Sequence, residues 1–133
     1  MESLLPLLLL ISLTSVIGLL FRAKKGVIKK GTRVKISEGE FGGKYGSRLT
    51  ILQFSTTFCS ECRTAKAIVK DVVKDSKDIT YVEVDAESNL DLVRRVDIRS
   101  TPTTIFLDSK GFEIARAKGA PKRDQLIKAI KAI

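Results

Sequence analysis

The chain has 133 residues, of which 44% are hydrophobic, and this allows one domain with its own core plus an extension. It contains two cysteines and no histidine, so hydrolases that rely on a Cys–His or Ser–His pair are excluded. The net charge is +9, but the excess is local, with nine basic against two acidic residues at positions 22–48, so we expect no nucleic-acid partner.

An apolar run at the N-terminus predicts a membrane anchor. Leu4 to Phe21 contains eighteen residues without a charge, which is just long enough to span a bilayer. A cleaved signal peptide is the alternative. It is disfavoured because no basic residue precedes the run, the run exceeds the usual hydrophobic region, and no A-x-A-like site follows it. We expect an uncleaved transmembrane anchor over residues 1–21, which makes the protein single-pass.

A basic segment follows the apolar run, while only Glu2 and the terminal amine precede it. Its first basic residues are Arg22, Lys24, Lys25, Lys29 and Lys30. The positive-inside rule therefore favours a domain on the cytoplasmic side, with the extracytoplasmic side as the alternative. Residues 22–48 are expected to form a basic linker and the start of the domain. Within them, Arg33–Ile36 alternates like an edge strand, and several glycines between Ser37 and Ser47 disfavour a helix.

The two cysteines lie at a predicted strand-to-helix turn. Leu49–Phe54 is rich in β-branched and aromatic residues, as in a buried strand. The apolar face of a helix that would begin near Ser60 comprises Ala65, Ile68, Val69, Val72 and Val73. Cys59 is therefore expected at the helix N-terminus, where free N–H groups and the helix dipole favour a thiolate. Cys62 follows one turn later on the same face, where the two sulfurs can bond to each other.

Two other uses of a cysteine pair are disfavoured. A structural zinc site needs about four nitrogen or sulfur ligands, so carboxylates or a second subunit would have to complete one here. Haem attachment through a C-x-x-C-H motif fails because residue 63 is Arg. We expect no metal and no haem.

The remaining elements alternate between strands and helices. Ile79–Asp85 alternates in polarity and is expected to be a central strand. Ser88 is expected to cap a short helix over Leu90–Val96. Thr103–Leu107 and Phe112–Ala117, joined by a short turn, indicate a β-hairpin, and an amphipathic helix follows. This order predicts an α/β fold in which helices flank a mixed central sheet.

Three motifs in this order resemble the thioredoxin family. They are the C-x-x-C turn after a buried strand, Thr101-Pro102 before the penultimate strand, and Gly119 after the hairpin. The resemblance implies a thioredoxin-like domain over residues 49–133 that exchanges disulfides with partner proteins and needs no cofactor beyond its redox-active disulfide. It also implies a cis Pro102 beside the cysteines and a Thr101 that offers main-chain hydrogen bonds to an extended substrate. Without the family, Pro102 would be an ordinary strand-start proline.

Several positions depart from the family pattern. Ser60-Glu61 replaces the common Gly-Pro between the cysteines. Glu61 should oppose ionisation of Cys59, while the helix end, Arg63 and Lys66 should favour it.

Three further positions differ from the family pattern. Phe58 stands where a tryptophan usually precedes the first cysteine, which changes the docking surface. Gln53 replaces a common Asp, and Glu83 replaces a common Lys. Our hypothesis is that Glu83 accepts the proton of Cys62 when that thiol attacks the mixed disulfide, with Gln53 as its hydrogen-bond neighbour. The alternative is a solvent-exposed strand glutamate.

The sequence thus predicts a membrane-anchored thiol-disulfide oxidoreductase. Cys59 attacks a disulfide in a partner protein, and Cys62 resolves the mixed disulfide. A cytoplasmic domain would act as a reductase that a cellular thiol donor re-reduces, whereas an outward-facing one would reduce selected substrates or insert disulfides. Two alternatives remain. One is a non-catalytic adaptor with a static disulfide, and the other is a redox sensor that changes the affinity of a partner.

Overall fold

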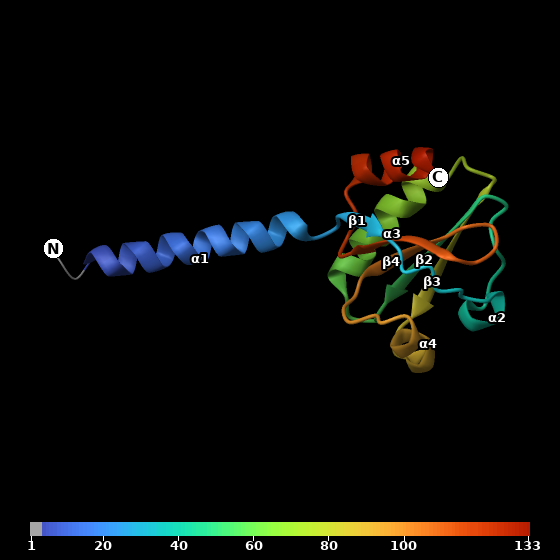
Figure 1. Ribbon diagram of the computed structural model, residues 1–133, viewed down its shortest axis with the longest axis horizontal. Coiled ribbons are helices and arrows are strands. Elements are labelled where there is room, and N and C mark those ends of the chain that lie inside the picture. The colour runs from blue at the N-terminus through green and yellow to red at the C-terminus, as the bar shows by residue number, and fades with distance from the viewer. Residues whose placement is uncertain (1–3) are drawn as a thin grey trace.

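Helix α1 (Leu4–Lys24) projects from the rest of the chain in the computed structural model, which describes residues 4–133 (Figure 1). None of its residues is buried, and its best 18-residue window has a mean hydropathy of 2.5. It is the one helix in the described chain that is long and apolar enough to cross a membrane, a property that signal sequences share. Residues 1–3, which the expected anchor includes, lie outside the described residues.

Five strands form one mixed sheet. They are β1 (Ile28–Lys30), β2 (Leu49–Ser55), β3 (Ile79–Asp85), β4 (Thr103–Leu107) and β5 (Glu113–Lys118). Their order across the sheet is β1-β5-β4-β2-β3, in which β2 and β3 are parallel and the other neighbours are antiparallel. The predicted mixed sheet is confirmed, and the bounds of the last four strands agree with those expected from the sequence to within one residue.

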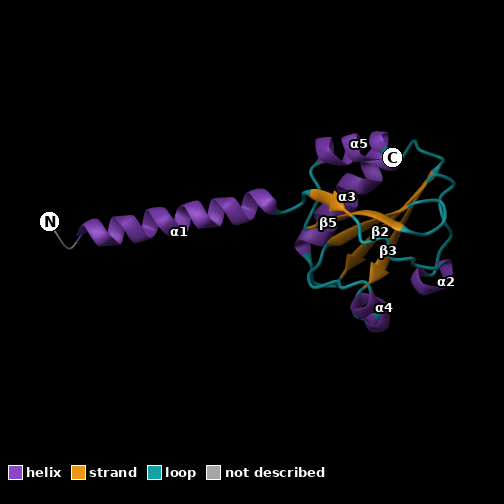
Figure 2. Ribbon diagram, in the orientation of Figure 1, coloured by secondary structure: helices purple, strands orange, loops and turns teal. Residues whose placement is uncertain are grey.

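Helices cover both faces of this sheet (Figure 2). They are α2 (Glu38–Phe41), α3 (Ser60–Val73), α4 (Leu90–Arg95) and α5 (Arg123–Ala132). On one face, Ile51 of β2 packs in a cluster with residues of α3 and α5, and on the other Leu52 packs with residues of α2 and α4. Because successive side chains of a strand point to opposite faces, β2 serves both clusters, and all 7 of its residues are buried.

The strand expected at the centre of the sheet, β3, lies at its edge. The far side of β2 is taken by β4, where Leu52 lies opposite Ile105. The alternation within β3 does place Val84 in one cluster and Tyr81 against the other, as expected. Alternation shows which face of a strand is buried, but it carries no information about how many neighbours the strand has.

The segment expected as a basic linker contributes to the domain. Strand β1, which begins at Ile28, pairs with β5, and Ile36 is fully buried. The edge strand expected at Arg33–Ile36 is reduced to an isolated bridge. The folded unit therefore includes β1, which precedes the edge strand expected at Arg33–Ile36. Local patterning missed this because the pairing joins β1 to a strand far along the chain.

Helix α2 forms where glycines were expected to prevent a helix. A capping box begins it, in which the Glu40 carboxylate accepts a hydrogen bond from the Ser37 backbone N–H at 2.7 Å. Gly42 ends it in the left-handed conformation with φ 71°, so this glycine terminates the helix instead of preventing it. The cap of α4 also differs, since Asn89 takes the N-cap position and Ser88 bonds to the end of β3.

Candidate active site

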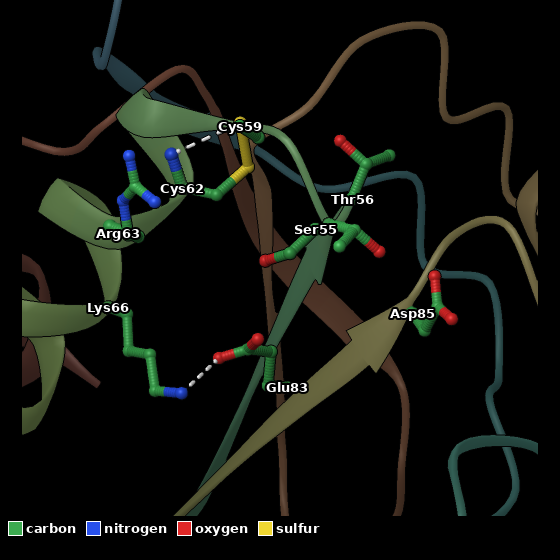
Figure 3. A pocket seen from close by; sticks show the side chains of 9 residues that line it. Ser55, Thr56, Cys59, Cys62, Arg63, Lys66, Glu83 and Asp85 are labelled. Carbon is green, nitrogen blue, oxygen red and sulfur yellow. Dashed lines mark hydrogen bonds and ion pairs between the residues drawn. A yellow bond between two sulfur atoms is a disulfide. The ribbon is translucent and has the colours of Figure 1, made fainter.

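The two cysteines form a disulfide at the start of α3 (Figure 3). The sulfurs are 2.16 Å apart and the Cα atoms 5.2 Å apart. Cys59 is the N-cap residue of α3, and its Sγ accepts a hydrogen bond from the backbone N–H of Cys62 at 3.2 Å. The predicted strand-to-helix turn is confirmed, because β2 ends at Ser55 and α3 begins at Ser60.

The two cysteines differ in their exposure to solvent. Cys59 is half-buried, whereas Cys62 is only 4% exposed. The free N–H groups and positive dipole end of the first turn of α3 favour a thiolate at the N-cap position. This asymmetry suits Cys59 to react with an outside disulfide and Cys62 to react only within the pair.

Phe58 stands directly before the reactive pair and is 98% exposed. An aromatic ring is a large apolar surface that gains free energy when a partner covers it. Its position beside Cys59 therefore suits contact with a docked protein.

A second segment lies beside the cysteine turn. The Thr101–Pro102 peptide bond is cis, as the family resemblance implies. Pro102 is buried, and its carbonyl oxygen accepts a hydrogen bond from the N–H of Gly119 at 2.8 Å. Gly119 has φ +82°, and a Cβ there would lie 3.8 Å from Oε2 of Glu61, the residue before Cys62. The fold thus links the cis proline through Gly119 to the turn that holds the disulfide.

A pocket of about 350 Å³ opens beneath the disulfide (Figure 3). Its lining comprises Ser55, Thr56, Thr57, Cys59, Cys62, Arg63, Lys66, Glu83 and Asp85. Glu83 therefore shares a pocket with Cys62, and its Oε2 pairs with Nζ of Lys66 at 3.0 Å. The Glu83 side chain is 38% exposed, so it is not a buried acid, and its place in the pocket lining puts it near the cysteines.

Gln53 is fully buried under the first turn of α3. Its Nε2 donates hydrogen bonds to the carbonyl oxygen of Cys62 at 2.8 Å and to Oγ of Ser55 at 3.0 Å. Its Oε1 accepts a hydrogen bond from the Tyr81 hydroxyl at 2.9 Å. The expected hydrogen bond between Gln53 and Glu83 is absent from the described side-chain contacts, although the two residues are register partners in β2 and β3. Tyr81 occupies the partner position instead.

Sequence reasoning assigned no role to Tyr81, and it pointed to Lys66 only as a charge near Cys59, not as a partner of Glu83. Tyr81 could have been found from its place two residues before Glu83 on the same face of β3, and Lys66 from its position one turn after Cys62. Burial, reinforced by the charge of Glu83, raises the pKa of Tyr81. The phenol therefore stays protonated and remains a hydrogen-bond donor to Gln53.

No group of three or more His, Cys, Asp or Glu side chains suited to a metal ion occurs among residues 4–133.

Comparison with known proteins gives a consistent result. The sequence model of the Thioredoxin family matches residues 34–132. Thioredoxin H5 of Oryza sativa subsp. japonica is 32% identical over 77 residues, which are 58% of this chain and 56% of that protein. A thioredoxin of Ophiophagus hannah is 28% identical over 86 residues, which are 65% of this chain and 80% of that protein.

A solved structure supports the same relationship. Thioredoxin-2 of a malaria parasite superposes with a TM-score of 0.59 and 28% sequence identity, covering 65% of this chain and 84% of that one. All of α1 lies outside the family match, which begins at residue 34.

Proposed function

This chain belongs to the thioredoxin family and is a thiol-disulfide oxidoreductase, and from this premise we propose that it works as a membrane-tethered reductase of protein disulfides. The observation that carries the proposal is the disulfide across the N-terminus of α3, in which Cys59 is partly exposed and Cys62 is buried. That arrangement provides a reactive pair whose two members have different tasks.

The reaction begins with the pair reduced. The Cys59 thiolate attacks one sulfur of a partner disulfide and forms a mixed disulfide, while the other partner sulfur leaves as a thiolate. Cys62 then loses its proton and attacks Sγ of Cys59, which releases the second partner thiol. Two electrons pass to the partner, and the pair is left as the disulfide seen in the structure. A thiol donor must reduce it again before the next turnover.

Glu83 is proposed to accept the proton that Cys62 loses. The two side chains share one pocket, so the Glu83 carboxylate is placed to receive the proton directly or through one water. The alternative is that Glu83 serves only the ion pair with Lys66 at the edge of the sheet.

Substrate binding is assigned to the residues around the pair. The exposed ring of Phe58 supplies apolar contact, and Gly119, whose N–H bonds to the carbonyl oxygen of Pro102, lies beside Glu61 of the turn. Thr101 is proposed to offer main-chain hydrogen bonds to an extended substrate segment. The partners are therefore proteins that carry accessible disulfides.

The tether is proposed to be α1. It is apolar all round with no buried residue, and such a helix needs either a protein partner or lipid around it. Its hydroxyl groups form hydrogen bonds within the helix. Oγ of Ser12 donates to the carbonyl oxygen of Leu9 at 2.9 Å, and Oγ of Ser15 donates to the carbonyl oxygen of Ile11 at 2.8 Å. The basic residues after it favour a cytoplasmic domain, and a signal sequence or an outward-facing domain are the alternatives.

Reduction of insulin by the full-length chain in detergent or liposomes tests the activity, with a dithiol as the electron source and Cys59→Ser as the control. We expect turnover in the wild type and none in the variant. An inactive wild type would favour the adaptor. Redox-dependent binding of a partner with little turnover would favour the sensor. Resistance of the protein to carbonate extraction from membranes tests the anchor separately.

A further inference from the structure

The connection between α1 and the folded domain is short and tightly held. Only three residues separate Lys24, the last residue of α1, from Ile28, the first of β1. Within this connector, the N–H of Gly26 donates to the carbonyl oxygen of Lys118 at 2.6 Å. Gly26 has φ +74°, and a Cβ there would lie 2.1 Å from the carbonyl oxygen of Ala120. The backbone of the connector therefore packs directly against the segment that follows β5.

The same connector touches the cysteine turn. Nζ of Lys25 pairs with Oε1 of Glu61 at 3.5 Å, and Glu61 lies between the two cysteines in the sequence. A Cβ on Gly119 would lie 3.4 Å from the N atom of Gly26 and 3.5 Å from Cβ of Lys25. Because the Lys25–Glu61 pair is exposed, the backbone packing holds the connector in place more than the charges do. The connector thus forms one border of the surface around the disulfide.

This contact limits how far the redox pair can move from the end of α1. Three extended residues span at most about 10 Å, whereas a flexible linker of about thirty residues has a typical end-to-end distance of about 30 Å. Figure 1 shows α1 joining the domain on the side where β1 and the first turns of α3 lie. If α1 spans a bilayer, the cysteine turn is held close to the membrane surface.

The charges beside the connector agree with this placement. A cavity of about 300 Å³ is lined by Lys24, Lys29, Lys30 and Lys118, together with Arg116. Within the described part of the chain, none of these four lysines forms an ion pair, and Asp97, the acidic residue of the cavity, pairs with Arg99. Such a cationic face is attracted to anionic lipid headgroups, which would hold this side of the domain toward the bilayer.

We propose that the substrates are membrane proteins whose disulfides lie within a few residues of the bilayer surface, on the side of the folded domain. This inference rests on the proposed reductase function and names its substrate class. The exchange is the one given above: the reduced pair passes two electrons to the membrane-proximal disulfide and becomes a disulfide itself. A dithiol donor supplies the electrons for the next turnover.

The test uses the full chain in liposomes with two single-span reporter peptides. One carries a disulfide loop about three residues beyond its transmembrane segment, and the other carries the same loop on a Gly/Ser linker of about thirty residues. Reduction of each loop is followed by thiol alkylation with a dithiol as donor, after protease accessibility has shown that loop and domain share one side. In one variant, a Gly/Ser spacer of about twenty residues inserted between Lys24 and Lys25 lets the domain move away from the end of α1. The matched control carries the same spacer after Ile133.

We expect the wild type to reduce the membrane-proximal loop at least about tenfold faster than the distant one, because the proximal loop stays in the layer that holds the redox pair and so has the higher effective concentration there. The spacer after Lys24 should abolish most of this preference, and the spacer after Ile133 should preserve it. Equal rates for the two loops, or a preference that the spacer after Lys24 leaves unchanged, would overturn the inference while insulin reduction still supports the oxidoreductase. Loss of insulin reduction in the wild type would overturn the proposed function, and the inference would fall with it.

Discussion

The side-chain amide of Gln53 donates a hydrogen bond to the carbonyl oxygen of Cys62 at 2.8 Å. This contact joins the buried strand β2 to the first turn of α3, directly beneath the disulfide. The same amide also donates to Ser55 and accepts from Tyr81, so each of its polar atoms has a partner. A carboxylate could not make the two donations. The polar group beneath the pair is therefore a neutral amide that fixes the turn, whereas Glu83 lies in the wall of the pocket.

Replacing Gln53 with Glu is expected to destabilise the fold at neutral pH. The buried carboxylate would face the Cys62 carbonyl without a donor, at a cost of at least about 2 kcal/mol in the free energy of unfolding. Burial raises the pKa of such a carboxyl, and its protonated form can donate again, so the loss should shrink as the pH falls. Urea unfolding of Gln53→Glu and of the wild type, at pH 7 and at successively lower pH, measures the effect. Wild-type stability at pH 7 would contradict the role given to Gln53.

The two cysteines should differ when each is replaced by serine. In Cys62→Ser the accessible Cys59 still attacks a partner disulfide, but the mixed disulfide cannot be resolved, so a covalent complex accumulates. In Cys59→Ser the remaining thiol is buried and should form little complex. Non-reducing mass spectrometry after incubation with a disulfide-bonded substrate measures both. Equal complex formation by the two variants would refute the assignment of attack and resolution.

The hypothesis for Glu83 predicts a kinetic effect. Glu83→Gln removes the proposed proton acceptor and should slow resolution of the mixed disulfide by about tenfold or more near neutral pH. The pH dependence of the rate should also change shape, which loss of an ion pair with Lys66 alone would not produce. Glu87→Gln is the matched control, because Glu87 is an exposed glutamate outside the pocket. A rate and pH profile equal to those of the wild type would leave Glu83 as a surface residue.

A buried ion pair away from the cysteines should support stability. Glu113 is fully buried, accepts hydrogen bonds from Arg116 and from Oγ1 of Thr32, and faces an Arg116 that is only 12% exposed. Glu113→Ala leaves the arginine without its partner and is expected to cost about 3 kcal/mol in the free energy of unfolding. Asp71→Ala, which removes a partner of exposed ion pairs, should cost less than about 1 kcal/mol.

The same pair predicts a dependence on pH. Burial opposes the charge of Glu113, but the hydrogen bonds from Arg116 and Thr32 outweigh it, so the pKa of Glu113 lies below its usual value. A lowered pKa means that the stabilisation is complete above the unfolded value, about 4.3, and is lost as the pH falls through the folded one. Denaturant midpoints of Glu113→Gln should therefore vary less with acid pH than those of the wild type. Parallel pH curves for the two proteins would contradict this account.

Much of the fold could be predicted from the sequence because it follows from local spacing. The helical spacing after Cys62 located α3, alternation located β3, and the short turn between Leu107 and Phe112 located the hairpin. What failed were relations between distant segments. The pairing of β1 with β5 and the edge position of β3 depend on which strands meet, and local patterning does not encode that choice.

The site shows the same division. The predicted placement of Cys59 and Cys62 at a helix N-terminus was confirmed. It could be predicted because the end of the strand pattern and the start of the helical pattern together locate the turn between them. The predicted hydrogen-bond partner of Gln53 was wrong. Tyr81 and Glu83 lie on the same face of β3, and although Glu83 is the register partner of Gln53, the Tyr81 hydroxyl makes the hydrogen bond. The length and the burial of the two side chains determine which one bonds to Gln53, and neither property can be read from the alternation of polar and apolar residues.

The reduction potential of the Cys59–Cys62 pair tests the central claim of a reductase most directly. The full chain in liposomes is equilibrated with buffers of defined dithiol-to-disulfide ratio, and the fraction of oxidised pair is measured by alkylation and mass spectrometry. The account predicts a value close to about −270 mV, as in thioredoxin, at which the pair donates electrons to protein disulfides. A potential above about −180 mV would mark the pair as an oxidant and contradict the proposal.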